Sequence, residues 1–330
     1  MYDNLIQYLS LVLIVAIPLI ITAIGGLFTE RSGVTNIALE GIMILGAFSA
    51  LVITNRIPAS SVGGPFMLYL VGIIIAGGVG LSISLLHGIA AIKMKSDQII
   101  SATAINTFAP ALSLFLTMSL TLGEGQGSDK IPVDAGQFVI TEVPLLSKIP
   151  FIGDLFFKNI YPALYIGIII LILSYIILYK TKFGLRLRAC GENPHAADAA
   201  GVNIYKMRYA GVMISGALAG IGGFFLITSF TILFDSSVSG YGFLAIAVLI
   251  FGNWKPWNIA WSALIFSALL TLSKGIAFFP VLERGLDDLG VNKNVLSMLP
   301  YIATLIVLVI TSKNSAAPKA VGQSYDKGER

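Results

Sequence analysis

The sequence has 330 residues, of which 56% are hydrophobic and only 12% are charged. Soluble domains carry charge on about 25% of their residues, so this chain lacks the charge that a water-exposed surface requires. The composition excludes a secreted, fibrous, disordered or nucleic-acid-binding protein and indicates an integral membrane protein.

Cysteine and histidine are too rare to form the usual metal or redox sites. The single cysteine, Cys190, excludes a disulfide framework, and the two histidines, His87 and His195, have no nearby residues of ligand type. The sequence also lacks a P-loop, a His-Glu-x-x-His motif and a Gly-x-Ser-x-Gly motif. We therefore expect a non-catalytic chain with no metal and no cofactor.

Nine apolar segments approach the roughly 20 residues that a membrane-spanning helix needs. They are residues 5–28, 37–54, 66–92, 98–120, 160–179, 208–232, 241–252, 257–279 and 296–312. No Lys or Arg precedes Arg31, so the first segment is predicted to be a retained span and not a signal peptide. Residues 241–252 would rise only about 18 Å as a helix, which indicates either a broken span or a re-entrant hairpin.

The positions of Lys and Arg orient these segments, because cytoplasmic loops are enriched in both residues. Nine crossings with the amino terminus outside place 14 of the 21 basic residues in the cytoplasm, 6 outside and Lys274 within a span. If residues 241–252 form a re-entrant hairpin, 11 basic residues lie in the cytoplasm and 9 lie outside. The count favours nine crossings in one domain, residues 1–312, with a cytoplasmic tail at residues 313–330.

Glu40 lies inside a predicted span, where charge is costly and often functional. It follows the polar link 29–36 by one turn, with a helix cap expected at Thr35 or Asn36. Two interpretations remain open. The carboxylate is stabilised by a helix amino terminus, or it is a gate or pathway residue paired with Arg31 or a neighbouring span.

The scarcity of buried charge indicates a neutral, polar cargo. Lys274 can extend its amine to the outer interface, and Ser or Thr side chains in a span either contact the solute or join helices. The candidate pathway or gate residues are Glu30, Arg31, Asn36, Glu40, Ser101, Asn106, Thr107 and Lys274. Glycines such as Gly216 and Gly220 predict close helix packing.

Two long loops separate the spans. The outer loop, residues 121–159, is either a tether or a surface for a partner, and its residues 144–157 have the apolar and polar patches of a segment lying along the membrane. The cytoplasmic loop, residues 180–207, contains the signals of a short helix over residues 194–200: Asn193 as N-cap, Pro194 in the first position and Gly201 after the end.

This helix is too short to cross a membrane. It is either a connector or a helix that sits in the groove of another protein. The predicted coupling segment comprises Gly191, Glu192, Asn193, Pro194, His195, Ala196, Ala197, Asp198, Ala199, Ala200 and Gly201.

Two long motifs carry a family resemblance. Residues 30–47 (ERSGVTNIALEGIMILGA) and 183–203 (FGLRLRACGENPHAADAAGVN) resemble permease subunits of bacterial ABC importers for nucleosides and simple sugars, within the group that includes the ribose and branched-chain amino acid permeases. Residues 145–153 (LLSKIPFIG) and 318–322 (PKAVG) extend the resemblance to nearly the whole chain.

The resemblance implies an all-α permease of the vitamin B12 importer (type II) fold, with up to ten helices, in the bacterial cell membrane. It further implies a second permease subunit that is a different, homologous chain, an ABC ATPase below, an extracytoplasmic substrate-binding protein above, and nucleosides as the solute. Residues 194–200 match the family's coupling segment, which seats in the ATPase. A ribose or other simple-sugar permease, a branched-chain amino acid permease and an ion-coupled secondary transporter remain alternatives, whereas an intramembrane enzyme lacks a recognisable nucleophile and base.

Overall fold

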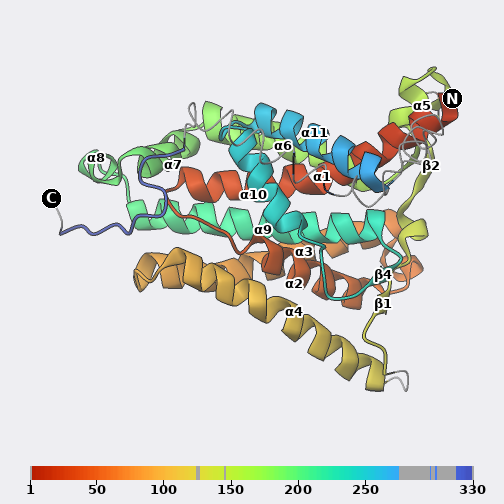
Figure 1. Cartoon of the computed structure of the whole chain (residues 1–330), viewed down its shortest axis with the longest axis horizontal. Coiled ribbons are helices and arrows are strands. Elements are labelled where there is room, and N and C mark those ends of the chain that lie inside the picture. The colour runs from red at the N-terminus through yellow and green to blue at the C-terminus, as the bar shows by residue number, and fades with distance from the viewer. Residues whose placement is uncertain are drawn as a thin grey trace.

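A computed structural model of the chain describes residues 2–123, 127–144, 146–274, 298, 302 and 317–328. These residues form an elongated bundle of helices (Figure 1). The longer helices are α1 (Tyr2–Arg31), α2 (Leu39–Thr54), α3 (Pro65–Gly88), α4 (Gln98–Gly123), α6 (Pro162–Lys180), α9 (Ile204–Phe230), α10 (Tyr241–Phe251) and α11 (Pro256–Lys274). The shorter ones are α5 (Ile152–Phe156), α7 (Lys182–Glu192) and α8 (Pro194–Ala199), with a π-helical turn, η2 (Ile89–Lys93), after α3.

Eight of the nine predicted apolar segments coincide with these longer helices. The ninth, residues 296–312, lies outside the described residues apart from positions 298 and 302. Five helices, which are α1, α3 with η2, α4, α6 and α9, are long and apolar enough to cross a membrane, while α2, α10 and α11 are shorter apolar helices. The described part of the chain is therefore mostly helical and polytopic.

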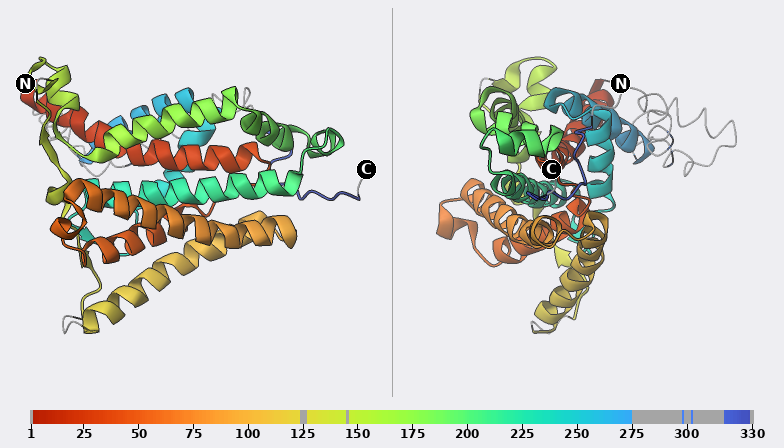
Figure 2. Two further views of the ribbon diagram at one scale, coloured as in Figure 1. Left: turned by 180° about the vertical axis from the view of Figure 1, so that it is seen from behind. Right: turned by 90° about the vertical axis from the view of Figure 1, so that its left-hand side faces the viewer.

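Helix α9 is at the centre of the bundle and contacts α1, α2 and α3. Glycines permit this packing, as the sequence predicted. A Cβ atom added to Gly80 of α3 would lie 2.2 Å from the backbone oxygen of Gly216, and one added to Gly220 would lie 2.1 Å from that of Ala76. Small residues let membrane helices approach backbone to backbone. Helix α4 contacts α2 and diverges from the bundle (Figure 2).

Short strands gather at one end of the bundle, which we call the sheet end. Strand β1 (Ile131–Pro132) pairs with β4 (Leu233–Phe234), and β2 (Ile140–Glu142) pairs with β3 (Lys158–Ile160), both antiparallel. The loop at residues 121–159 thus contains strands, helix α5 and 3-10 turns at 135–138 and 146–148, which the sequence did not predict. Helices α7 and α8 lie at the opposite end, which we call the α8 end (Figure 1).

Helix α10 lies steeply across the other helices (Figure 1). The chain leaves strand β4 at the sheet end, continues without regular structure to Gly240, forms α10 and then turns at residues 252–255 beside the end of α1. Eleven helical residues and the extended segment before them therefore connect the two ends. Helix α10 is as short as the length of residues 241–252 predicted, and the choice between a broken span and a re-entrant hairpin stays a prediction.

Two local predictions near the start of α2 are wrong. Helix α1 continues to Arg31, so Glu30 is a buried helical residue and not part of a polar link. The N-cap of α2 is Ala38 and not Thr35 or Asn36. Asn36 instead accepts a hydrogen bond from the Ala38 backbone N–H at 3.1 Å through its side-chain oxygen. The polar residue therefore supports the turn just before the helix.

Candidate functional site

The short helix at the α8 end has the caps that the sequence predicted. The side-chain oxygen of Asn193 accepts a hydrogen bond from the Ala196 N–H at 3.0 Å, and Pro194 occupies the first turn. Helix α8 ends at Ala199, one residue before the predicted end, and Gly201 has a φ of +81°. This left-handed conformation favours glycine, and it lets the chain turn back into α9.

The predicted coupling segment, residues 191–201, presents a small exposed face. Pro194 and Ala197 are buried against the protein, Asp198 is half-buried, and Gly191 is buried at the end of α7. The exposed residues are Glu192, Asn193, His195, Ala196, Ala199, Ala200 and Gly201. Four of these seven residues are Ala or Gly, whose small side chains let another protein approach closely at little cost in side-chain entropy.

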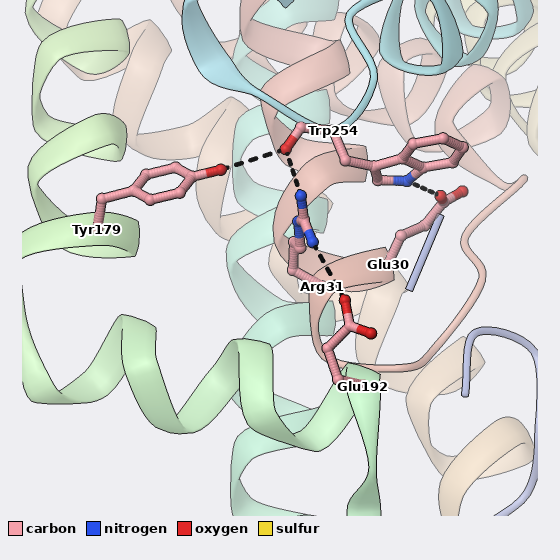
Figure 3. Close-up of polar contacts among 5 residues, drawn as sticks. All are labelled: Glu30, Arg31, Tyr179, Glu192 and Trp254. Carbon is pink, nitrogen blue, oxygen red and sulfur yellow. Dashed lines mark hydrogen bonds and ion pairs between the residues drawn. The ribbon is translucent and has the colours of Figure 1, made fainter. Parts of the chain in front are cut away.

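The coupling segment joins the end of α1 through a group of polar contacts, shown in Figure 3. Arg31 Nη1 lies 3.6 Å from Glu192 Oε1, and Arg31 Nη2 donates to the backbone oxygen of Trp254 at 2.9 Å. The indole N–H of Trp254 donates to the buried carboxylate of Glu30, and the Tyr179 hydroxyl donates to the same Trp254 oxygen at 3.4 Å. We call these five residues the α1-end node.

The node fixes the turn between α10 and α11. Asn253 and Trp254 have φ values of 49° and 54°, a left-handed conformation that is rare for bulky residues and persists only when neighbouring contacts enforce it. The hydrogen bonds at Trp254 supply such contacts. Sequence reasoning missed Trp254, although Gly252 and Pro256 mark the turn around it.

The carboxylate of Glu40 binds the amino terminus of α10. Its Oε1 and Oε2 atoms accept hydrogen bonds from the backbone N–H groups of Gly240 at 2.8 Å and Gly242 at 2.6 Å. A helix amino terminus carries partial positive charge and free N–H groups, so a buried carboxylate is satisfied there. The first interpretation, a carboxylate stabilised by a helix amino terminus, describes this contact, although the helix is α10 and not α2. Arg31 contacts Glu192 and Trp254 and not Glu40, and a gate or pathway role for Glu40 stays a prediction.

Asn36 and Asn106 surround the start of α2 with Glu40. The Asn36 amide donates to Ser215 Oγ of α9 at 3.0 Å. Asn106 of α4 accepts from the Gly41 N–H at 2.9 Å and donates to the Ile37 oxygen at 2.9 Å. These contacts connect α2 to both α4 and α9, so three candidate residues lie together.

The remaining candidates lie apart from this group. Ser101 lies 2.9 Å from Nδ1 of His87, whose Nε2 lies 2.9 Å from the Thr35 oxygen. Thr107 is exposed on α4 and donates to the Thr103 oxygen of its own helix at 2.9 Å. The side chain of Lys274 lies outside the described residues. No cluster of three His, Cys, Asp or Glu side chains suited to a metal occurs within the part of the chain that the structure describes.

Comparison with known families identifies the kind of bundle. The family described as "Branched-chain amino acid transport system / permease component" matches residues 8–309. The chain belongs to this permease family. The permease is therefore a multi-pass membrane protein, and the resemblance found in its two long motifs is confirmed.

Relatives of the permease cover it from end to end. It is 40% identical to the guanosine ABC transporter permease protein NupQ of Bacillus subtilis, with 99% of this chain and 100% of that protein covered. It is 39% identical to the nucleoside ABC transporter permease protein NupC of Lactococcus lactis, with 96% of both chains covered. It is 28% identical to the putative glucose ABC transporter permease protein TsgC13 of Haloferax volcanii, over 94% of this chain and 95% of that one. No solved structure matches the permease.

Proposed function

We propose that this permease is the transmembrane subunit of an ATP-driven ABC importer that moves nucleosides into the cell. Two relatives of about 40% identity over their full length, named as guanosine and nucleoside ABC transporter permeases, support the solute class. The scarcity of charge in the spans agrees with a neutral cargo. The permease itself is non-catalytic, and ATP hydrolysis takes place in a separate ATPase subunit.

The ATPase binds the permease at α8. The observation that carries this assignment is that Glu192, two residues before the small and capped helix α8, belongs to the α1-end node through its ion pair with Arg31. A Cβ atom added to Gly191 would lie 2.5 Å from the Arg31 backbone oxygen, so the chain preceding α8 is in close contact with the end of α1. A displacement of α8 by the ATPase is therefore transmitted to α1 through residues that are in direct contact.

Helix α10 is the next element on this path, because polar contacts hold both of its ends. Glu40 binds its amino terminus, while Glu30 and Arg31 bind Trp254 just after its carboxyl terminus. We assign Glu30, Arg31, Asn36, Glu40 and Asn106 to a gate that reorients α10 against α2 when α8 moves. Such a transition between outward-open and inward-open states requires an element with two arrangements, and the short, obliquely placed α10 is suited to that role.

The permease acts within a larger assembly in the cell membrane. Its amino terminus is outside and its carboxyl terminus cytoplasmic, as the count of Lys and Arg predicts, which puts α8 in the cytoplasm beside the ATPase. A second, homologous permease chain completes the pathway, and an extracytoplasmic binding protein delivers the solute at the sheet end. Membrane lipid covers exposed apolar residues such as Ile100, Phe115 and Leu122 of α4.

A second candidate solute is a simple sugar, because one relative is named as a putative glucose permease. Branched-chain amino acids are a third, suggested by the description of the family. Ion-coupled secondary transport is the remaining alternative mechanism. These possibilities differ in the solute that is accumulated and in whether ATP or an ion gradient drives it.

Reconstitution of the purified complex separates these functions. The permease, with its second permease chain, ATPase and binding protein, is placed in proteoliposomes loaded with ATP, and the uptake of radiolabelled guanosine, uridine, ribose, glucose and leucine is compared. ATP-dependent uptake of the nucleosides alone is the expected result. Accumulation of ribose, glucose or leucine in place of nucleosides contradicts the proposed solute, and uptake driven by an ion gradient without ATP contradicts the ABC mechanism.

A further inference from the structure

The tail of the chain packs across the α8 end. We call residues 318–326 the strap; they run past α7 toward α8 (Figure 1). Ala320 donates its backbone N–H to the Gly191 oxygen at 2.8 Å, just before α8. Arg208 of α9 donates from Nη1 to the Gln323 oxygen at 2.8 Å. Main-chain atoms of the strap are therefore bonded to the helices on both sides of α8.

Tyr325 attaches the strap to α8 itself. Its side chain is only 4% exposed, and its ring centroid lies 5.2 Å from that of His195 and 5.6 Å from that of Tyr205. It shares an apolar cluster with Cys190 and Ala197. Burial, followed by a hydrogen bond to the Asp198 carboxylate, raises the pKa of Tyr325. His195 and Asp198 of α8 therefore both interact with this one side chain, and Ala197 lies in the same apolar cluster.

The strap also reaches the segment between η2 and α4. The carboxylate of Asp326 forms an ion pair with Lys95. Arg208, which is 1% exposed, has its Nε and Nη2 atoms without a hydrogen-bond partner. A buried guanidinium is costly unless its donors are satisfied, so the Gln323 oxygen is an important acceptor for it. The strap thus contacts α7, α8, α9 and the segment between η2 and α4.

We propose that the strap is a positioning element for energy coupling, which holds α8 on the bundle so that motion of α8 is transmitted to the spanning helices. This inference rests on the proposed role of α8 as the ATPase contact. A helix of six residues is marginal by itself, so its position depends on neighbours. The strap supplies such neighbours, and it is separate from α7 and α9, the helices that flank α8 in the chain.

The first test measures the attachment of the strap without any transport assay. Cys190 is buried, and burial raises its pKa to about 11, so maleimide reagents should label it slowly at pH 7.5. Removal of residues 318–330, or the substitution Tyr325→Ala, opens the buried cluster that Tyr325 shares with Cys190 and should speed labelling by about tenfold or more, since a thiol reacts faster when it is exposed and ionises more readily. Ser324→Ala, at an exposed strap residue, is the matched control and should label like the wild type.

The second test measures coupling in the complete transporter. Tyr325→Ala should lower the number of solute molecules taken up per ATP hydrolysed by about fivefold or more, in the range of ordinary coupling energies, while ATPase binding persists. Tyr325→Phe keeps the ring and should retain most of the uptake. Lys95→Asp alone breaks the ion pair with Asp326 and should lower the uptake per ATP hydrolysed. Adding Asp326→Lys reverses the charges of the pair and should restore that uptake.

The outcomes separate this inference from the proposed function. If removal of the strap leaves both Cys190 labelling and coupling unchanged, while deletion of α8 abolishes uptake, the strap has no positioning role and the proposed function stands. If labelling rises but coupling does not change, the strap covers α8 without acting in transport, and the inference is wrong. If the wild-type complex transports without an ATPase, the proposed function fails, whatever the labelling result.

Discussion

Glu40 Oε2 accepts a hydrogen bond of 2.6 Å from the backbone N–H of Gly242, which lies 202 residues later in the chain. With the second bond to Gly240, this contact joins the start of α2 to the start of α10. It places a buried carboxylate where free N–H groups and the helix dipole offset its charge. The connection gives the proposed gate a specific chemical basis.

Glu40→Gln tests this connection. The substitution removes the charge and leaves an amide that can accept only one of the two N–H groups, so we expect a loss of about 2 kcal/mol in stability. Melting temperature in detergent and nucleoside uptake should both fall. Glu142→Gln, at an exposed strand residue, should change neither. Wild-type values for Glu40→Gln contradict the assignment of Glu40 to the gate.

Trp254→Phe tests the α1-end node. It removes the indole N–H and leaves the buried Glu30 carboxylate without that donor, at an expected cost of about 1–3 kcal/mol. The number of solute molecules taken up per ATP hydrolysed should also decline in this variant. Trp261→Phe, on the exposed face of α11, is the control. The double variant with Glu30→Gln should recover stability, because the neutral amide tolerates burial better than a carboxylate.

Gly80→Ala tests the close packing of α3 on α9. The added methyl would lie 2.2 Å from the Gly216 oxygen, so the helices must separate, at a cost of about 2 kcal/mol or more. Gly78 is on the same helix and has nothing within 4 Å of an added Cβ, so Gly78→Ala should be neutral or stabilising by about 0.5 kcal/mol. Equal thermal stability of the two variants refutes the packing argument.

Asp154→Asn tests the sheet end through its pH dependence. Hydrogen bonds from Lys158 at 2.7 Å and then Tyr2 at 2.9 Å lower the pKa of Asp154 below its ordinary 3.8. Because the pKa of Asp154 is lower in the folded state, its ionised carboxylate stabilises the fold above pH 3.8. This stabilisation is lost as the pH falls through the lower folded-state pKa. The wild type should therefore melt at a higher temperature than Asp154→Asn at pH 7, and the difference should shrink as the pH falls below 3.8. A difference that stays unchanged throughout acid titration contradicts this assignment.

Local signals in the sequence predicted α8 well, because its determinants are adjacent in the chain. Asn193, Pro194 and Gly201 act on backbone groups a few residues away, and each has its expected role. Apolar length likewise located the long apolar helices among the described residues, since a membrane restricts spanning helices to a narrow range of lengths. Both predictions needed no knowledge of tertiary contacts.

The contacts of the gate could not be predicted in this way. Glu40 meets Gly242, and Glu30 meets Trp254, across more than 200 residues, and neither pairing leaves a periodic or local pattern. The sequence singled out Glu40 as a charge inside a span and placed Glu30 and Arg31 in a polar link, but it gave no role to Trp254. The strap was noted only as part of a cytoplasmic tail and a family motif, because its binding depends on main-chain atoms of Ala320 and Gln323.

The central claim is that α8 couples this permease to an ATPase for nucleoside import. The most direct measurement is ATP-driven guanosine uptake in proteoliposomes by the complete complex, with the wild-type permease and with a permease lacking residues 194–200, both checked for membrane insertion. We predict accumulation with the wild type, and loss of both uptake and ATPase binding with the deletion. Undiminished ATP-driven uptake by an inserted permease without α8 contradicts the account.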